Sequence, residues 1–189
     1  FSVVTIEKAT KYPNFHHIIP NQFDDLMLCW EKLHERGYKR VGLVVMSDLA
    51  ERWHHQWEAA HNYASAQFES APAPIPILKL DKSNQTDRIR SWLREHRPQA
   101  VISRCDRFFE AAKQEKLRVP EDIGYVSLNI SDDRPGASGI DQNRKTMGSI
   151  AVDALNSLLL RNQRGQQDVA TGTLVDGTWH EGDTLPARL

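Results

Sequence analysis

The sequence is poor in cysteine, in long apolar runs and in excess charge of either sign. Two cysteines among 189 residues, Cys29 and Cys105, exclude a disulfide scaffold and suit a reducing compartment. Lys and Arg total 24 and Asp and Glu total 25, so the basic excess that usually marks a nucleic-acid-binding domain is missing. The longest apolar runs, such as 41–46, fall far short of the roughly 20 residues that a membrane-spanning helix needs. These absences argue against an integral membrane protein and a basic nucleic-acid binder.

Several common catalytic and nucleotide-binding motifs are absent as well. The chain has neither G-x-G-x-x-G nor G-x-x-x-x-G-K-[ST], the two standard glycine-rich loops that hold phosphates. It also lacks G-x-S-x-G, the nucleophile elbow of α/β-hydrolases. No charged segment followed by an apolar segment indicates a signal peptide at the start. The sequence therefore disfavours a nucleotide cradle of either standard kind and an α/β-hydrolase, and no signal peptide is visible in it.

One histidine-rich stretch invites a metal interpretation. His54, Glu58 and His61 could share one face of a helix, with spacings of four and three residues. However, His54 and His61 would then be roughly 10 Å apart along the helix axis, since each residue rises about 1.5 Å. One zinc ion, with bonds of about 2 Å, does not span that distance. We therefore predict no metal site and no cofactor.

What is present is a regular alternation of apolar strands and amphipathic helices. Strands are predicted at 1–6, 17–19, 41–46, 77–80, 100–103, 123–128 and 174–175. Helices are predicted from Asn21 to Gly37 and at 49–68, 84–96, 106–116 and 144–160. This order is typical of an α/β protein with a mainly parallel sheet and helices on both faces. Ligands of such sheets bind beyond the carboxyl ends of the strands.

Polar residues stand directly after two of these strands. Cys105 and Asp106 follow the strand at 100–103, and Asn129 follows the strand at 123–128. Each has a simpler alternative: a buried thiol for Cys105, and a helix cap or turn residue for the other two. Their joint placement at strand ends favours a ligand site.

Four segments share order and spacing with one known family. They are LHERGYKRVGL at 33–43, RCD at 104–106, LRVPEDIGYVSLN at 117–129, and IDQ at 140–142 followed by Gly148 and Ala154-Leu155. From about residue 16 to 185 the chain resembles the effector domain of the LacI/GalR family of transcriptional regulators.

The resemblance implies a type I periplasmic-binding-protein-like fold, with two Rossmann-like lobes and mainly parallel sheets. Residues 1–20 and 141–164 would belong to an N-terminal lobe that is incomplete here, and 21–139 and 165–189 to the C-terminal lobe. Members are usually cytoplasmic homodimers. They bind operator DNA through a helix-turn-helix domain, which we expect upstream of Phe1 and not in this chain. A small effector, often a sugar, binds between the lobes. No enzymatic activity is implied.

The resemblance also places an effector site on this sequence. Phe23 and Trp53 would offer flat apolar faces to a sugar ring, and polar side chains would hold its hydroxyls. Trp53 stands where the family commonly has Arg, and it remains open whether it lines the pocket or the core; for Trp57 we expect the core. The expected effector-binding residues are Phe23, Asp24, Trp53, Cys105, Asp106, Asn129 and Gln142.

Two alternatives remain. One is a periplasmic sugar-binding protein of a transporter, which shares the fold but needs a secretion signal. The other is an enzyme that uses Cys105 or the His54–His61 segment, for which no complete catalytic set is found. We also expect residues 1–6 to form an internal strand of the incomplete lobe.

Overall fold

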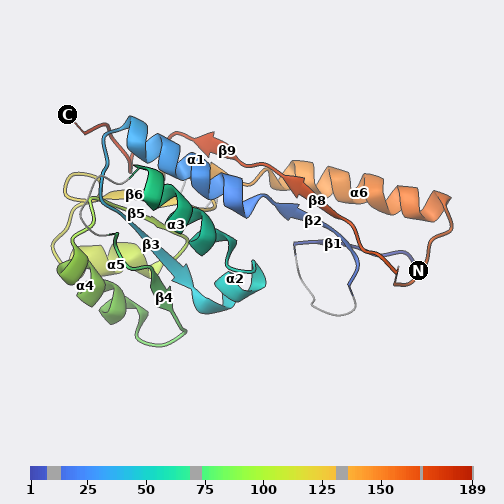
Figure 1. Ribbon diagram of the computed structural model, residues 1–189, viewed down its shortest axis with the longest axis horizontal. Coiled ribbons are helices and arrows are strands. Elements are labelled where there is room, and N and C mark those ends of the chain that lie inside the picture. Colours follow the sequence, from blue (N-terminus) through green and yellow to red (C-terminus); the bar gives the residue numbers. More distant parts are fainter. Residues whose placement is uncertain (8–13, 69–73, 131–135, 167, 189) are drawn as a thin grey trace. The chain divides into compact units, whose positions relative to one another are not determined.

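The computed structural model describes residues 1–7, 14–68, 74–130, 136–166 and 168–188. The chain forms two compact units: unit 1 contains Phe1–Asn21 and Gln142–Thr178, and unit 2 contains Gln22–Asp141 and Trp179–Leu189 (Figure 1). The strands are β1 (Val4–Ile6), β2 (His16–Pro20), β3 (Val41–Met46), β4 (Leu78–Leu80), β5 (Ala100–Ser103), β6 (Gly124–Ser127), β7 (Gly139–Asp141), β8 (Gly172–Val175) and β9 (Thr178–His180). The helices are α1 (Gln22–Glu35), α2 (Ser47–Arg52), α3 (Gln56–Phe68), α4 (Gln85–His96), α5 (Arg107–Gln114) and α6 (Arg144–Leu160). The predicted α/β class with mainly parallel sheets is confirmed.

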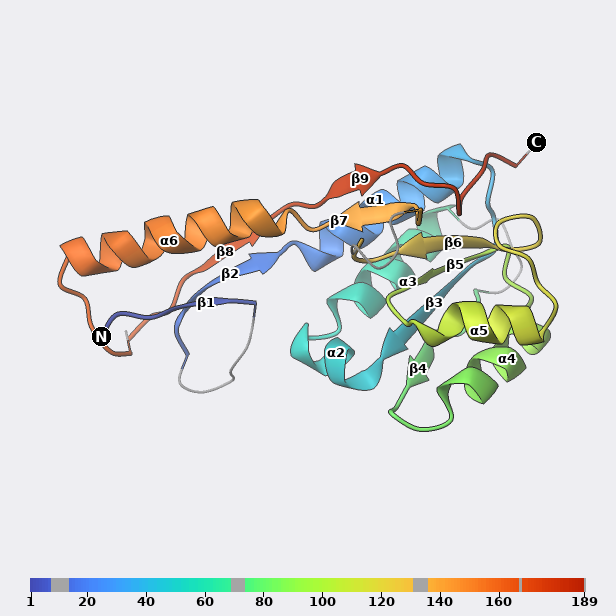
Figure 2. The same ribbon diagram turned by 180° about the vertical axis from the view of Figure 1, so that it is seen from behind.

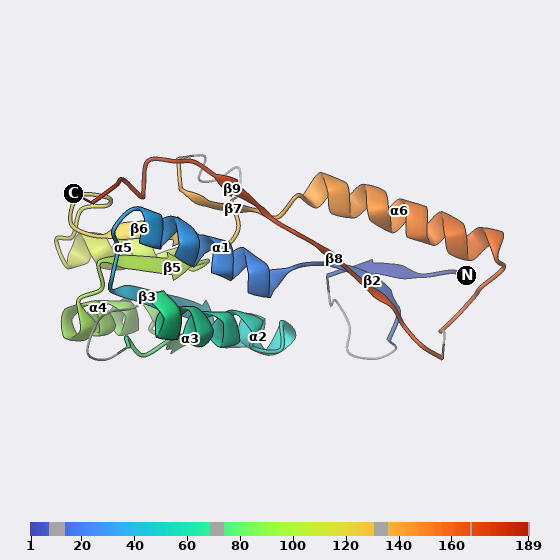
Figure 3. The same cartoon turned by 45° about the horizontal axis from the view of Figure 1, so that its top comes forward.

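Unit 2 is built on a six-stranded sheet in the order β4-β3-β5-β6-β7-β9. The neighbouring pairs from β4 to β7 are all parallel. Helix α1 packs against α3 (Figures 1 and 3), and α4 packs against α5 (Figure 2). Strands β3, β5 and β6 are buried almost throughout, because helices cover both faces of a parallel sheet. This burial explains why 41–46 reads as a continuous apolar run.

Close packing in unit 2 depends on a glycine in β3. The Trp92 indole of α4 lies so near Gly42 that a Cβ added there would come within 2.7 Å of the ring atom Cζ2. The Trp92 Nε1–H donates a hydrogen bond of 2.8 Å to the Pro76 carbonyl. The strand therefore needs a residue without a side chain where α4 crosses it.

Helix α1 ends where the sequence predicts. Gly37 has a φ of +81°, which a residue without Cβ adopts at little cost. The Gly37 N–H donates to the His34 carbonyl, and the Tyr38 N–H donates to the Leu33 carbonyl. These two bonds form a Schellman motif, which satisfies carbonyls left open at a helix end. The prediction that Gly37 stops this helix is confirmed.

The single helix predicted at 49–68 is wrong, because the chain forms α2 and α3 with a break between them. His54 and His55 both have positive φ, at 50° and 58°. The His54 N–H donates to the Glu51 carbonyl and the His55 N–H donates to the Ala50 carbonyl, again a Schellman pattern. No glycine or proline stands at this break, so the sequence lacks the strongest signals for a helix end.

Unit 1 is a three-stranded parallel sheet in the order β1-β2-β8, with α6 packed along β1 and β2 (Figure 2). Its core is a small cluster that includes Ile18, Met147 and Val175. The family resemblance implied that residues 165–189 belong to the C-terminal lobe. In the structure, residues up to Thr178 group with unit 1, because β8 pairs with β2. Strand β9 was not predicted.

Candidate functional site

The carboxyl edge of the unit 2 sheet collects most of the expected site residues. Trp53 follows β3 at the end of α2, Cys105 and Asp106 follow β5, and Asn129 follows β6. Because β3, β5 and β6 are parallel neighbours, their carboxyl ends lie at the same edge. The chain runs from β3 out to β4 and then returns to β5 on the other side of β3. This reversal makes the β3–β5 boundary a topological switch point, where open α/β sheets bind ligands.

A hydrogen-bond network holds the end of β5 in place. The Ser103 hydroxyl donates to the Val44 carbonyl at 2.9 Å and accepts the Cys105 N–H at 2.9 Å. The Cys105 thiol lies 4.0 Å from the Gln85 Oε1, to which it donates. Gln85 Nε2 in turn donates to the Asp81 carbonyl at 2.7 Å. Gln85 thus links the ends of β4 and β5, a role that the sequence analysis did not anticipate, and Cys105 is a buried residue of this network.

Asn129 is fixed by its backbone and presents a buried amide. Its N–H and its carbonyl both contact the Ser127 hydroxyl, at 3.3 and 2.9 Å. The side chain is only 7% exposed. Its Oδ1 has no hydrogen-bond partner among the described residues. A buried acceptor without a partner costs about 1–3 kcal/mol, so such an atom calls for an explanation.

The two tryptophans of this region are both buried. Trp53 is 2% exposed and Trp57 is 1% exposed. Neither indole Nε1–H has a partner within the described part of the chain. Trp53 is the C-cap residue that follows α2, at the switch point, whereas Trp57 lies on the buried face of α3.

Phe23 and Asp24 lie in the first turn of α1. This helix leads into β3 and runs against it, so its first turn faces the carboxyl edge of the sheet. The half-buried Phe23 ring packs against Tyr63 of α3, with centroids 6.3 Å apart. Asp24 is exposed, whereas its neighbours Gln22 and Asp25 are buried. The sequence pattern indicates only the exposed carboxylate of this turn and not the two buried polar residues beside it.

The remaining two expected residues have different settings. Asp106 is exposed at the start of α5 and makes no side-chain capping hydrogen bond to that helix. Gln142 is buried and is the first residue of the second segment of unit 1.

A surface hollow of about 650 Å³ also lies at the edge of unit 2, lined by the first turns of α4 and α5, including Gln85 and Arg107.

The histidine-rich stretch serves packing and ion pairing. The Trp30 Nε1–H of α1 donates to His61 Nδ1 at 3.2 Å, and burial lowers the pKa of His61 to about 4. Glu58 contacts His55 at 2.8 Å and Lys79 at 3.1 Å. Burial alone would raise the pKa of Glu58, but these hydrogen bonds outweigh it and lower that pKa. Within the described ranges, no group of three His, Cys, Asp or Glu residues could hold a metal ion.

The family model of the periplasmic binding protein-like domain matches residues 30–184. The chain belongs to this family. The match spans both units, from α1 to the segment after β9, and includes the whole carboxyl edge of the unit 2 sheet. A comparison with curated protein sequences finds no match.

Solved structures of the same fold are similar over the whole chain. A LacI family transcriptional regulator from Enterococcus faecium with bound ribose has a TM-score of 0.71 at 12% identity, covering 100% of this chain and 72% of that one. A periplasmic binding protein/LacI transcriptional regulator from Alkaliphilus metalliredigens with D-xylulofuranose has a TM-score of 0.71 at 12% identity, covering 98% and 71%. A regulator of the Lacl family from Rhizobium etli has a TM-score of 0.73 at 18% identity, covering 97% and 70%.

None of the described helices is both long and apolar enough to cross a bilayer.

Proposed function

We propose that this chain is the effector-sensing part of a LacI-type transcriptional regulator and binds a sugar-like molecule. Unit 1 then corresponds to part of the N-terminal lobe and unit 2 to the C-terminal lobe. The intact regulator acts as a cytoplasmic homodimer and binds operator DNA through a helix-turn-helix domain outside this chain. The protein senses and does not catalyse. The membership of the periplasmic binding protein-like family and the sugars bound to structural neighbours support this proposal.

The observation that carries the proposal is a pair of buried polar atoms at the carboxyl edge of unit 2. Trp53 offers an N–H donor and Asn129 an amide acceptor, and neither atom has a partner among the described residues. A sugar hydroxyl both donates and accepts, so it can satisfy either atom. The Phe23 ring and the Trp53 indole add flat apolar surface for the sugar ring. The seven expected residues, including Asp24, Cys105, Asp106 and Gln142, remain the proposed site.

The test is ligand-induced thermal stabilisation of the chain with a panel of pentoses and hexoses. A ligand at one hundred times its Kd stabilises the folded state by about 2.7 kcal/mol, a shift that is easily measured. We expect Asn129→Ala and Asp24→Ala to abolish the shift without unfolding the protein. Asn62→Ala is the matched control, because Asn62 is exposed on α3. Shifts that are unchanged in both site variants would refute the site.

A second pair of variants tests whether the Trp53 side chain lines the effector pocket or belongs to the hydrophobic core. Trp53→Phe and Trp57→Phe each remove one buried indole N–H that has no partner in the described structure. Both should change stability by similar amounts, but only Trp53→Phe should weaken the response to sugar. Equal responses of the two variants would place Trp53 in the core.

The regulatory role has its own test. A longer gene product should carry a helix-turn-helix module upstream of Phe1, and the sugar should change its operator affinity in a gel-shift titration. The sugar can shift DNA binding only by its differential affinity for two lobe arrangements. A signal peptide upstream would instead favour the periplasmic sugar-binding protein.

A further inference from the structure

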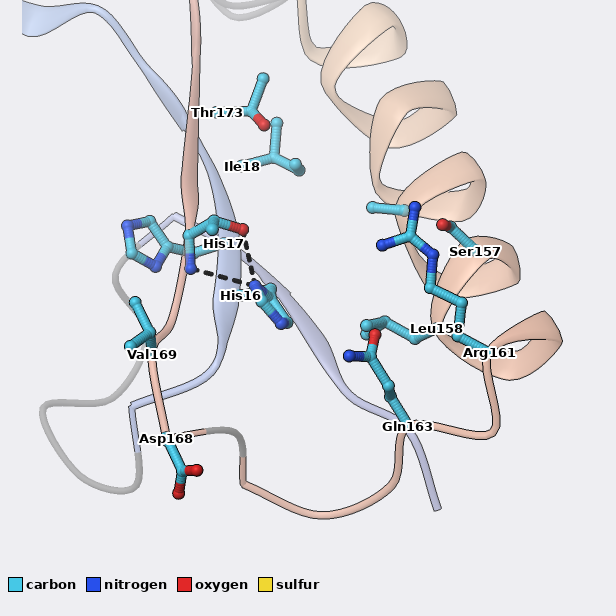
Figure 4. A pocket seen from close by; sticks show the side chains of 12 residues that line it. His16, His17, Ile18, Ser157, Leu158, Arg161, Gln163, Asp168, Val169 and Thr173 are labelled. Atoms are coloured by element: carbon cyan, nitrogen blue, oxygen red, sulfur yellow. Dashed lines mark hydrogen bonds between the residues drawn. The ribbon is translucent and has the colours of Figure 1, made fainter.

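A second cavity lies within unit 1, and none of the residues of the proposed effector site lines it. It has a volume of about 470 Å³ and opens between the last turns of α6 and the beginnings of β2 and β8 (Figure 4). This volume is within the range of small-molecule sites, roughly 300–1,000 Å³. All its lining residues belong to unit 1. The cavity therefore does not depend on how the two units are arranged.

The ring of His16 is held in one tautomer at the wall of this cavity. The Thr171 N–H donates to His16 Nδ1 at 3.0 Å, and the Thr171 hydroxyl lies 2.6 Å from the same nitrogen (Figure 4). Because Nδ1 accepts a backbone N–H, the neutral ring carries its hydrogen on Nε2. His16 thus contributes an N–H donor that is oriented by its bond to the start of β8.

The opposite wall supplies further donors from α6 and the residues after it. Arg161 and Ser157 project from the end of α6, and Gln163 lies on the same side (Figure 4). None of these three side chains has a hydrogen-bond partner within the described ranges. The cavity therefore has a surface rich in hydrogen-bond donors. The Arg161 guanidinium, the Gln163 amide and the Ser157 hydroxyl lie on one side, and the His16 N–H lies on the other (Figure 4). Such a surface suits carboxylate or phosphate oxygens, which accept several hydrogen bonds.

The floor and the mouth of the cavity indicate which groups the ligand carries besides its anionic group. Ile18 and Leu158 are buried and form an apolar floor. The Asp168 carboxylate lies across the cavity from Arg161 and can accept a hydrogen bond from a hydroxyl (Figure 4). We propose that this cavity binds a small hydroxylated organic anion, with its carboxylate or phosphate on Arg161 and its hydroxyl groups toward Asp168.

The experiment uses the whole 189-residue chain and three probes of the same skeleton: glycerol 3-phosphate, D-glycerate and uncharged glycerol. Titrations followed by two-dimensional ¹H–¹⁵N NMR should show saturable shifts of the Thr171 and Thr173 amides with an anionic probe but not with glycerol. Binding of only one of the two anions supports the proposal and identifies the preferred group. Equal shifts with glycerol, or no saturable shift with any probe, would overturn it.

The matched variants are Arg161→Gln and Arg144→Gln. Both remove one exposed cation from α6 or its end, but Arg144 lies at the opposite end of the helix. Arg161→Gln should weaken binding of the anion by about tenfold, as expected for loss of a charge-assisted contact, and Arg144→Gln should leave it unchanged. Undiminished affinity in Arg161→Gln rejects the site, and equal weakening in both variants indicates attraction by net charge alone.

Discussion

Protonation of His61 should make the stability of unit 2 fall in mild acid. The folded-state pKa of about 4 is below the ordinary value of 6.5, because the ring is buried between α1 and α3. Below pH 6.5 the unfolded chain therefore binds a proton that the folded chain excludes. Stability rises with pH wherever the unfolded state binds more protons. The contribution of neutral His61 is thus complete above pH 6.5 and is lost as pH falls to about 4.

The size of this effect follows from the pKa difference. Each pKa unit corresponds to about 1.4 kcal/mol, so the full loss is about 3 kcal/mol. Other acid-sensitive groups act at lower pH. Hydrogen bonds from Arg118 to Asp122 lower the pKa of the Asp122 carboxyl from 3.8 to about 2. Against the effect of burial, hydrogen bonds from His55 and Lys79 lower the pKa of Glu58 from 4.5. Between pH 6.5 and 4.5 the slope should therefore come mainly from His61.

The assay is urea unfolding at a series of pH values from 7.5 to 4.5. His61→Gln keeps an acceptor for the Trp30 N–H but cannot be protonated in this range. The unfolding free energy of the wild-type chain should fall by about 1.4 kcal/mol per pH unit below 6.5, whereas that of His61→Gln should stay nearly flat. A variant that keeps the full wild-type slope would refute the assignment of this slope to His61.

Three further predictions concern packing and thiol reactivity. Gly42→Ala should lower the unfolding free energy by about 1–3 kcal/mol, because the new methyl group overlaps the Trp92 ring; Trp92→Leu in the same chain should recover part of this loss in urea titrations. Gly148→Ala should raise the free energy of unfolding by roughly 0.5–1 kcal/mol, since nothing lies within 4 Å of the added Cβ in α6. Native protein should react slowly with a thiol reagent at Cys105 and more slowly still at Cys29, where burial raises the thiol pKa. Rapid labelling of Cys29 would contradict its burial.

The regular elements could be predicted from the sequence wherever one local signal dominates. Gly37 ends α1, and the apolar spacing of α6 predicts its bounds at Arg144 and Leu160. The break between α2 and α3 could not be predicted, because His54 and His55 adopt a left-handed conformation that is uncommon for residues other than glycine, and no glycine or proline marks the position. The alternation of strands and helices was enough for the fold class. It was not enough to show that β8 pairs with β2, which is a contact between distant segments.

The candidate site shows the same limit at the scale of single side chains. Residue positions at strand ends could be predicted, since parallel strands share an edge, and Cys105, Asp106 and Asn129 do follow β5 and β6. Which polar side chains are buried depends on the helix face, which shifts by about 100° with each residue. The buried Asp25 therefore lies beside the exposed Asp24 that the sequence favoured. The bridging role of Gln85 depends on the ends of two separate strands, β4 and β5, and has no sequence signal.

The distribution of aromatic and apolar side chains determines how these experiments report on the two units. All five tryptophans lie in unit 2, so indole fluorescence follows the unfolding of the unit that holds the switch-point edge. Of the eight large apolar side chains exposed in the described part, all but Tyr63 belong to unit 1. Unit 1 also has only a small core cluster, and its stability should therefore be the lower of the two. A sugar bound at Trp53 and Asn129 should raise the midpoint temperature of the unfolding transition that fluorescence detects. An anion bound at Arg161 should instead raise the midpoint temperature of a transition that circular dichroism detects and fluorescence does not. The two proposed sites are thus separable within one chain.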